Sequence, residues 1–229
     1  MPWQLVESAR HADTHLELYV KDGTYMIRAN GLELMNGFAH DSETAFGQLA
    51  AELAPNAAPN ILIAGLGLGY TLAAAREALG ARGTITVAEF SPAVIDWFER
   101  HVRASVLPVM PKNVVIRETD AIAHLKSGAR YDLILLDIDN GPEPFTLSSN
   151  ATLYDRAGLE LLRTALNEDG SVLLWSGFQS DAFEALARET GFSVARRIVA
   201  NAPRPELDHH IYVLNARLLD LGGAALRDR

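Results

Sequence analysis

The sequence predicts an α/β fold in which a small antiparallel β-meander precedes a seven-stranded, mostly parallel sheet with an antiparallel last strand. Three observations lead to this prediction. From residue 60 onward, short apolar segments alternate with segments of helical periodicity, as in sheets whose parallel strands are joined by helices. The first apolar segment runs into a glycine-dense turn, Gly65 to Gly69, before a helix. The last two apolar segments are joined only by Asn201 to Asp208, which is too short for a parallel crossover.

The first forty residues predict the β-meander. Asp22-Gly23 and Asn30-Gly31 are typical hairpin turns, and they separate short segments rich in β-branched, aromatic and aliphatic residues. The expected strands are 16–20, 25–29 and 32–35. We therefore predict a separate N-terminal unit over residues 1–40.

A helix is expected next, and it opens the second predicted unit, residues 41–217. Asp41 or Ser42 can cap this helix, and Pro55 stops it after about Ala54. The alternating pattern then predicts helices at about 69–80, 92–103, 121–127, 153–166 and 181–190. The strands expected between and after them are 60–64, 84–89, 114–119, 132–137, 171–175, 193–199 and 210–215. Residues 218–229 are expected to form a weakly ordered tail.

The glycine turn and Glu89 together predict a nucleoside site. Glycines allow close approach of the backbone to a ligand, and the helix that follows presents free N–H groups. Glu89 ends the next apolar segment, twenty residues after Gly69. A carboxylate at this spacing can accept hydrogen bonds from both hydroxyls of a ribose.

Other polar residues are expected at the same edge, because ligands of open α/β sheets bind at the carboxyl ends of the strands. Asp120 follows the third predicted strand, where it could equally serve only as a helix cap. Asp137 follows a wholly apolar strand, and the alternative is that it only makes a turn with Gly141-Pro142. Trp175, at the end of the fifth strand, is interpreted as a core residue.

Composition excludes several classes of function. The net charge of −9 argues against a general nucleic-acid binder, which needs a basic surface. Without cysteine, the chain has no disulfide, cysteine-based zinc site or thiol nucleophile. No apolar run has membrane-spanning length, and the N-terminus lacks the pattern of a secretory signal. We expect a cytoplasmic protein that has no membrane partner and binds a small molecule. We expect no metal site, since neighbouring strand residues such as His209 and His210 point to opposite faces.

These residues match a known pattern. The turn Gly65–Gly69, Glu89, Asp120 and the segment from Tyr131 to Asp137 resemble class I S-adenosylmethionine-dependent methyltransferases, which have a Rossmann-like fold. The β-meander brings the chain closer to the spermidine synthase family, which shares that fold. The phrases His40-Asp41-Ser42-Glu43 and Leu136-Asp137-Ile138-Asp139-Asn140-Gly141-Pro142 resemble bacterial spermidine-synthase-like proteins. The resemblance covers most of the chain.

The resemblance implies a cofactor, either S-adenosylmethionine or decarboxylated S-adenosylmethionine, and roles for individual residues. Glu89 would hold the ribose hydroxyls, and Phe90 would flank the adenine. Asp120 and Ala121 would bind the adenine amino group and ring edge, and Asp137 would contact the cofactor and orient or deprotonate the attacking nucleophile. The residues implied to wrap the amino-acid or aminopropyl part are Gly65, Leu66, Gly67 and Gly69.

Departures from the family pattern bear on the reaction. Leu68 stands where polyamine synthases have an aspartate, Asn140 replaces the second acid of the strand-four loop, and Ala45-Phe46 replaces a Tyr-His pair. Asp139 and Asn140 are expected to contact the substrate, and Asp139 could replace one missing carboxylate. Holding ammonium groups in a partly dry slot needs such counter-charges.

The first hypothesis is therefore a spermidine synthase-like transferase that moves a methyl or related alkyl group to an unknown small nucleophile. The alternatives are a polyamine aminopropyltransferase and a non-catalytic nucleoside-binding protein. An NAD-dependent oxidoreductase is disfavoured, because Tyr70 occupies the sixth position of the turn, where a glycine is preferred. The family also implies a homodimer, and a lid is expected over residues 141–152.

Overall fold

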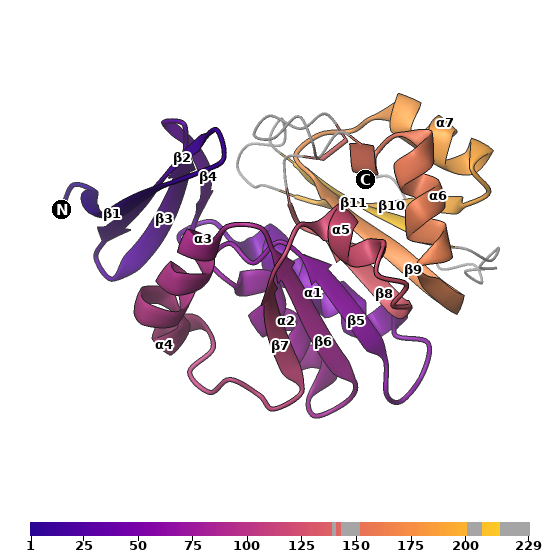
Figure 1. The fold of residues 1–229 in the computed structure, drawn as a ribbon, viewed down its shortest axis with the longest axis horizontal. Coiled ribbons are helices and arrows are strands. Elements are labelled where there is room, and N and C mark those ends of the chain that lie inside the picture. Colours follow the sequence, from indigo (N-terminus) through magenta and orange to yellow (C-terminus); the bar gives the residue numbers. More distant parts are fainter. Residues whose placement is uncertain (139–140, 143–151, 201–207, 216–229) are drawn as a thin grey trace.

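The structure is a computed structural model of the 229-residue chain, and it describes residues 1–138, 141–142, 152–200 and 208–215. The strands form two sheets (Figure 1). The predicted tail 218–229, the predicted substrate residues Asp139 and Asn140, and most of the predicted lid lie outside the described residues.

The N-terminal sheet has four antiparallel strands in chain order, one more than predicted. The additional strand is the first, Gln4–His11, which pairs with the second around an irregularity between Leu5 and Glu7. This irregularity and the many polar residues of the strand obscure the two-residue alternation expected for a strand with one buried face. The strands are β1 (Gln4–His11), β2 (Thr14–Lys21), β3 (Thr24–Ala29) and β4 (Leu32–Asn36).

The larger sheet has seven strands in the order β10-β11-β9-β8-β5-β6-β7. The prediction of a mostly parallel sheet with an antiparallel last strand is confirmed, because β11 runs antiparallel to both neighbours. This strand inserts between β9 and β10 instead of extending the edge. The strands are β5 (Asn60–Ala64), β6 (Thr84–Glu89), β7 (Val114–Glu118), β8 (Tyr131–Leu136), β9 (Leu166–Ser176), β10 (Ser193–Val199) and β11 (His209–Asn215).

The helices lie where the alternating pattern predicts them, with shifted ends. The helix expected to begin at 153 begins at Arg156, because the Asp155 side chain caps it by accepting from Gly158 N–H. The segment predicted as one helix at 92–103 contains a π-helical turn at Phe98–Val102. The α-helices are α1 (Asp41–Leu53), α2 (Tyr70–Leu79), α3 (Pro92–Trp97), α4 (Arg103–Val106), α5 (Ala121–Leu125), α6 (Arg156–Thr164) and α7 (Asp181–Glu189).

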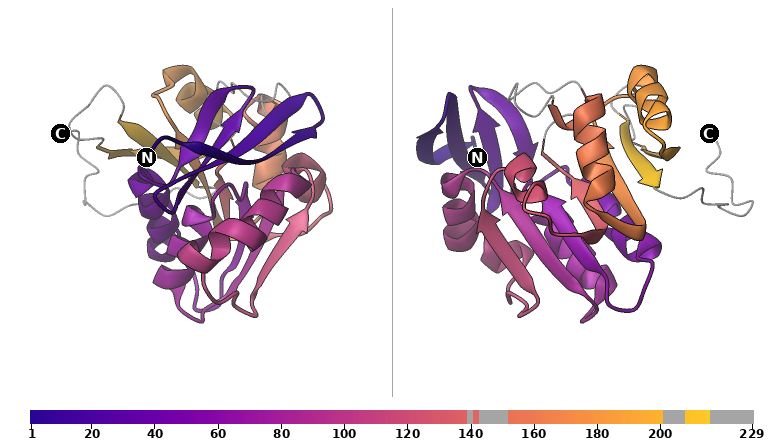
Figure 2. Two further views of the ribbon diagram at one scale, coloured as in Figure 1. Left: turned by 90° about the vertical axis from the view of Figure 1, so that its left-hand side faces the viewer. Right: turned by 45° about the vertical axis from the view of Figure 1, so that its right-hand side comes forward.

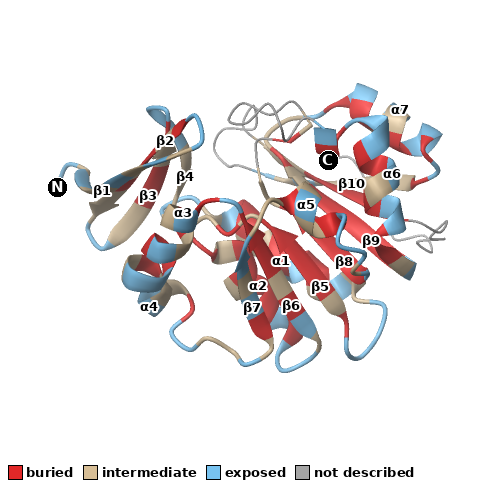
Figure 3. Cartoon of the chain, in the orientation of Figure 1, coloured by how far each residue is buried: buried red, intermediate tan, exposed pale blue. Residues whose placement is uncertain are grey.

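The central strands are buried on both faces (Figure 3), and successive residues serve two different core clusters. Ile61 and Ile63 face the cluster under α1, α2 and α3, whereas Leu62 and Ala64 face the cluster under α6 and α7. This division follows from the alternation of side chains along a strand. It explains why these strands read as unbroken apolar runs. Among the described residues, no helix is both long and apolar enough to cross a membrane.

The N-terminal sheet packs over the start of the larger unit, above α3 and the π-helical turn (Figure 2). Its buried side chains, such as Leu18 and Ile27, belong to the same core cluster as α1 and α3. On its outer side, the carboxylate of Glu7 accepts hydrogen bonds from Trp97 Nε1 at 3.1 Å and from Arg100 at 2.7 Å. The N-terminal sheet is thus held to α3 and the π-helical turn by both apolar packing and a polar contact.

Candidate functional site

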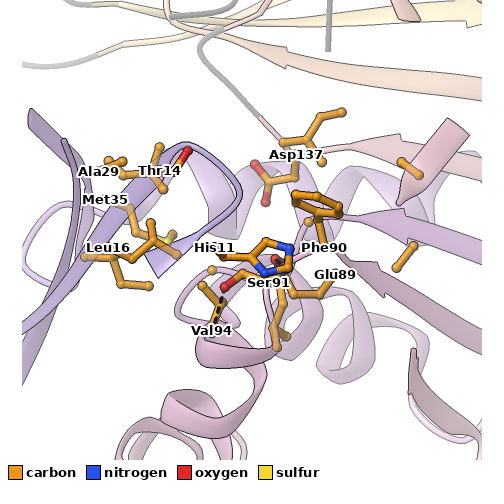
Figure 4. Close-up of a pocket in the computed structure, with 18 of the residues that line it drawn as sticks. His11, Thr14, Leu16, Ala29, Met35, Glu89, Phe90, Ser91, Val94 and Asp137 are labelled. Atoms are coloured by element: carbon orange, nitrogen blue, oxygen red, sulfur yellow. Dashed lines mark hydrogen bonds between the residues drawn. The ribbon is translucent and has the colours of Figure 1, made fainter. Parts of the chain in front are cut away.

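A pocket lies between the N-terminal sheet and the carboxyl ends of β5, β6 and β8 (Figure 4). One wall comes from the N-terminal sheet and is mostly apolar. The other comes from the turns and helix starts that follow the parallel strands. The lining residues include His11, Thr14, Leu16, Met35, Glu43, Gly65, Leu66, Gly67, Glu89, Phe90, Ser91, Asp120, Ala121, Asp137 and Trp175.

The glycine turn is shaped by protein neighbours. Gly65 has φ +96°, and a Cβ there would lie 2.0 Å from the carbonyl oxygen of Asp137. At Gly67, with φ +50°, a Cβ would lie 2.3 Å from the sulfur of Met35. That sulfur also accepts a hydrogen bond from Leu68 N–H at 3.0 Å. Each glycine therefore allows another part of the chain to approach the turn.

Leu66 and Leu68 have different environments. Leu66 lines the pocket, and its N–H donates to Glu89 Oε2 at 2.9 Å. Leu68 does not line the pocket, because its side chain is fully buried in the core cluster. Gly69 caps α2, and a Cβ there would meet the ring of Phe98 at 2.4 Å.

Glu89 ends β6 with its carboxylate facing the turn. Only 9% of the residue is exposed. Its two oxygens accept from the N–H groups of Leu66 and Ser91 at 2.9 and 2.7 Å. Burial raises the pKa of Glu89, and these backbone N–H groups oppose that rise by favouring the charged form. The backbone N–H groups of Gly67 and Phe90 also favour its charged form, so the carboxylate is surrounded by donors at the turn.

Phe90 is 39% exposed, although its neighbours in the pocket are largely buried. The imidazole ring of His11, from the end of β1, packs edge-on against it with ring centroids 4.4 Å apart. Figure 4 shows His11 reaching from the N-terminal sheet to this ring. His11 Nε2 is buried and has no hydrogen-bond partner among the described residues. A bound ligand could therefore complete the hydrogen bonding of this nitrogen.

Asp120 is a helix cap that also borders the pocket, and its contact with a ligand stays a prediction. Its carboxylate caps α5 by accepting from Ala123 N–H at 2.8 Å, and the residue also lines the pocket. Ala121, the first residue of α5, lines the pocket beside it.

Asp137 follows β8 and reaches the pocket from the opposite side to the N-terminal sheet (Figure 4). Its Oδ2 accepts a hydrogen bond from Thr71 Oγ1 at 2.6 Å. Burial, and then the charge of Glu43, raise the pKa of Asp137 to about 7. The hydrogen bond from Thr71 opposes this rise. Asp137 can therefore gain or lose a proton near neutral pH, which suits a general base.

Glu43 is a pocket residue that the sequence analysis missed. It lies on α1 with only 7% of the residue exposed, at helical spacing from the buried residues Phe46, Gly47 and Ala50. An acid on the apolar face of an amphipathic helix is unusual, and this pattern could have identified it.

Further lining residues that were not predicted as site residues include His11, Met35 and Trp175. His11 belongs to the strand that was missed. Trp175, interpreted as a core residue, packs against the core cluster and also lines the pocket. Its Nε1 is buried without a partner in the part of the chain that the structure describes. Among the same residues, no group of three or more acidic or histidine side chains could hold a metal ion.

Comparison with known proteins gives the fold of this chain. No family model matches it, and no curated protein matches it in sequence. Solved structures do match. One is a spermidine synthase in complex with the transition-state analogue AdoDATO, with a TM-score of 0.72 and 15% identity over 93% of this chain and 72% of that chain. Another is the spermidine synthase from Thermotoga maritima, with a TM-score of 0.73 and 16% identity over 93% and 73% of the two chains. The chain therefore has the fold of the spermidine synthases.

Proposed function

We propose that the chain is a spermidine synthase-like transferase that uses S-adenosylmethionine or its decarboxylated form and moves an alkyl group to a small nucleophile. The observation that carries the proposal is Asp137, a carboxyl group at the strand edge whose pKa is raised to about 7 inside a pocket. Perturbed titratable groups in such pockets are typical of catalytic sites. The fold shared with the spermidine synthases also supports the proposal.

The pocket has features that fit a nucleoside cofactor. Glu89 places a carboxylate in the pocket wall next to the glycine turn, and Phe90 offers an exposed ring. His11 Nε2 and Trp175 Nε1 are buried polar atoms that a ligand could satisfy. We propose that Glu89 holds the ribose and Phe90 flanks the adenine. Asp120 and Ala121 would contact its edge, and Gly65, Leu66, Gly67 and Gly69 would surround the remaining part.

When bound, the sulfonium cofactor would supply an electrophilic carbon and a good leaving group. The task left to the protein is to position the nucleophile and take up its proton. Thr71 occupies one side of the Asp137 carboxyl through Oδ2, which leaves Oδ1 for the nucleophile. In its ionised form, Asp137 would accept the proton at this oxygen.

Aminopropyl transfer is the second candidate. The sequence disfavours this reaction because Leu68 and Asn140 replace acids of the polyamine synthases. Glu43 supplies a pocket carboxylate that was not considered among these acids. Leu68, by contrast, points into the core, so this position supplies no counter-charge to the described pocket. Two carboxyl groups in one pocket suit a cationic acceptor.

The test is calorimetric titration of the protein with S-adenosylmethionine and, in parallel, with decarboxylated S-adenosylmethionine. The two ligands differ by one carboxylate. Tighter binding of the carboxylated form would support methyl transfer, whereas tighter binding of the decarboxylated form would support aminopropyl transfer. If neither bound and Glu89→Gln behaved like the wild type, the proposed cofactor would be wrong.

A further inference from the structure

Glu43 is enclosed on the inner face of α1 and borders the same pocket as Asp137. The Ser42 hydroxyl donates to its Oε2, so part of its hydrogen-bonding capacity is met by a neutral donor. Its position is set by the packing of α1 on α2, where Gly47 lies so close to Thr71 that a Cβ would be 2.5 Å from the Thr71 carbonyl oxygen. This close contact holds the two helices in one arrangement.

Thr71 connects the two acidic residues. Its hydroxyl donates to Asp137 Oδ2 at 2.6 Å and also lies 3.5 Å from the carbonyl oxygen of Glu43. Asp137 is held from the other side by its own N–H, which donates to the carbonyl of Ala64 at 2.9 Å. Both acidic residues are therefore anchored by backbone and hydroxyl contacts, and none of these contacts supplies a positive charge.

Among the described residues of the pocket, no lysine or arginine balances these carboxylates. A buried carboxylate without a positive partner is unfavourable, and a second one nearby adds repulsion. An acid beside such a carboxylate retains its proton to higher pH than an isolated acid would.

We propose that Glu43 is a positioning residue that acts through Asp137: the charge of Glu43 makes Asp137 hold its proton more tightly in the ligand-free pocket. The inference deepens the proposed function, on which its catalytic meaning rests. A positively charged ligand group would favour the ionised form of Asp137, and the displaced proton would leave to solvent. The base would thus become available when such a ligand is present.

The pKa of Asp137, raised to about 7 by burial and by the charge of Glu43, agrees with this arrangement. The same charge raises the pKa of Tyr70, after burial, and opposes the burial that lowers the pKa of His209. The titratable groups that line this pocket with Asp137 are Glu43 on α1, Glu89 on β6, Asp120 before α5 and His11 on β1. Tyr70 on α2 and His209 on β11 also lie within range of the charge of Glu43. Replacing Glu43 alone leaves the other groups in place, so it tests the effect of Glu43 on the pKa of Asp137.

The test follows the carboxyl carbons of aspartate residues by NMR as the pH is changed, using the ligand-free full-length chain with labelled aspartate. The signal missing from Asp137→Asn identifies Asp137. We expect its midpoint near 7 in the wild type. In Glu43→Gln, which keeps size but removes charge, the midpoint should fall by about one pH unit or more.

Two control variants test whether the shift of the midpoint is specific to Glu43. Asp41→Asn removes an equal charge from the exposed start of α1 and should leave the midpoint unchanged. Thr71→Val removes the donor to Oδ2 and should raise the midpoint, a shift of opposite sign. If Glu43→Gln does not fold, Glu43→Ala provides the same loss of charge and the same expected direction.

An unchanged midpoint in the Glu43 variant would overturn the inference, as would an Asp137 midpoint in the ordinary range near 4 in the wild type. Failure of the proposed function is seen separately, because the titration needs no cofactor. If S-adenosylmethionine and its decarboxylated form both fail to bind while the midpoints shift as expected, the coupling stands and the cofactor assignment does not.

Discussion

Gly65 shows how one residue can shape the site through its contact with another part of the backbone. Its positive φ of +96° brings the turn against the backbone of Asp137, where a Cβ would lie 2.0 Å from the carbonyl oxygen. Its N–H donates to Ala88, and Asp137 N–H donates to Ala64, so neither segment can easily move away. We infer that Gly65 sets the position of Asp137.

We therefore expect Gly65→Ala to destabilise the fold by more than Gly128→Ala. Gly128 has a similar φ of +86°, but a Cβ there meets nothing within 4 Å. Backbone strain alone should lower the free energy of unfolding of the Gly128 variant by about 1–3 kcal/mol. The clash in the Gly65 variant should add about 1–3 kcal/mol. Urea unfolding of both variants measures the difference, and equal losses would show that the contact with Asp137 does not matter.

Residues of the site were predictable to different degrees. Glu89, Asp120 and Asp137 follow strands directly, so the chain itself brings them to the sheet edge. The environment of Leu68 was not predictable in this way. The direction of a side chain within a turn depends on φ and ψ angles that a sequence pattern does not specify, and here it points into the core.

At the scale of elements, the attachment of β1 to the π-helical turn controls one wall of the pocket. Glu7 on β1 contacts Trp97, Arg100 and His101. His11, at the other end of the same strand, reaches Phe90. A change at Glu7 can therefore alter the pocket through the strand that carries both residues.

We predict that Glu7→Gln speeds hydrogen exchange at the backbone amides of β1. Hydrogen bonds from Arg100, then from His101, hold the pKa of Glu7 at about 2, so the carboxylate is bound in the folded state. Because this pKa is lowered, the ionised carboxylate stabilises the folded state at pH values above its ordinary pKa of 4.5. This stabilisation is lost as the pH falls toward 2. The difference between the variant and the wild type should therefore be present at pH 7 and shrink as the pH falls below 4.5.

The matched control is Glu99→Gln. Glu99 pairs with Arg103 within the same helical segment and does not bridge to the N-terminal sheet in the described contacts. Glu99→Gln should leave hydrogen exchange at the backbone amides of β1 unchanged. Because the Glu7 contacts are solvent-exposed, high salt should weaken the effect of Glu7→Gln, and an effect independent of both salt and pH would contradict the ionic explanation.

Elements with strong patterns were predicted well. Local signals predicted the apolar strands β5, β6 and β8, and all three are present. The two turns of the N-terminal sheet that contain a glycine were also predicted and are present. β1 was missed because its polar residues and its irregularity weaken the alternation. The π-helical turn was also missed, because the packing of Phe98 under Gly69 involves a distant segment.

At the scale of the whole molecule, the pocket is shared between two sheets, and neither forms it alone. A ligand bound there would contact both, so the free energy of binding would also hold the sheets together. The homodimer expected from the family remains a prediction.

If the proposed function is correct, saturating S-adenosylmethionine should slow hydrogen exchange on both sides of the pocket. Protection should appear in the glycine turn, near His11 and near Met35, and should be weaker in α7, which does not line the pocket. At a ligand concentration about 100 times Kd, binding should stabilise the protein by about 2.7 kcal/mol. Protection limited to the glycine turn would show that the N-terminal sheet does not take part in binding.

The order of apolar, glycine and acidic segments was enough to predict the class of sheet, its antiparallel last strand and the edge that carries Glu89, Asp120 and Asp137. These features follow from short-range geometry: a strand, its turn and the next helix are continuous in the chain. The contacts of Thr71 with Glu43 and Asp137, and of His11 with Phe90, join residues that are far apart in sequence. They exist because helices and sheets pack in one of many sterically allowed arrangements, and only the folded chain selects it.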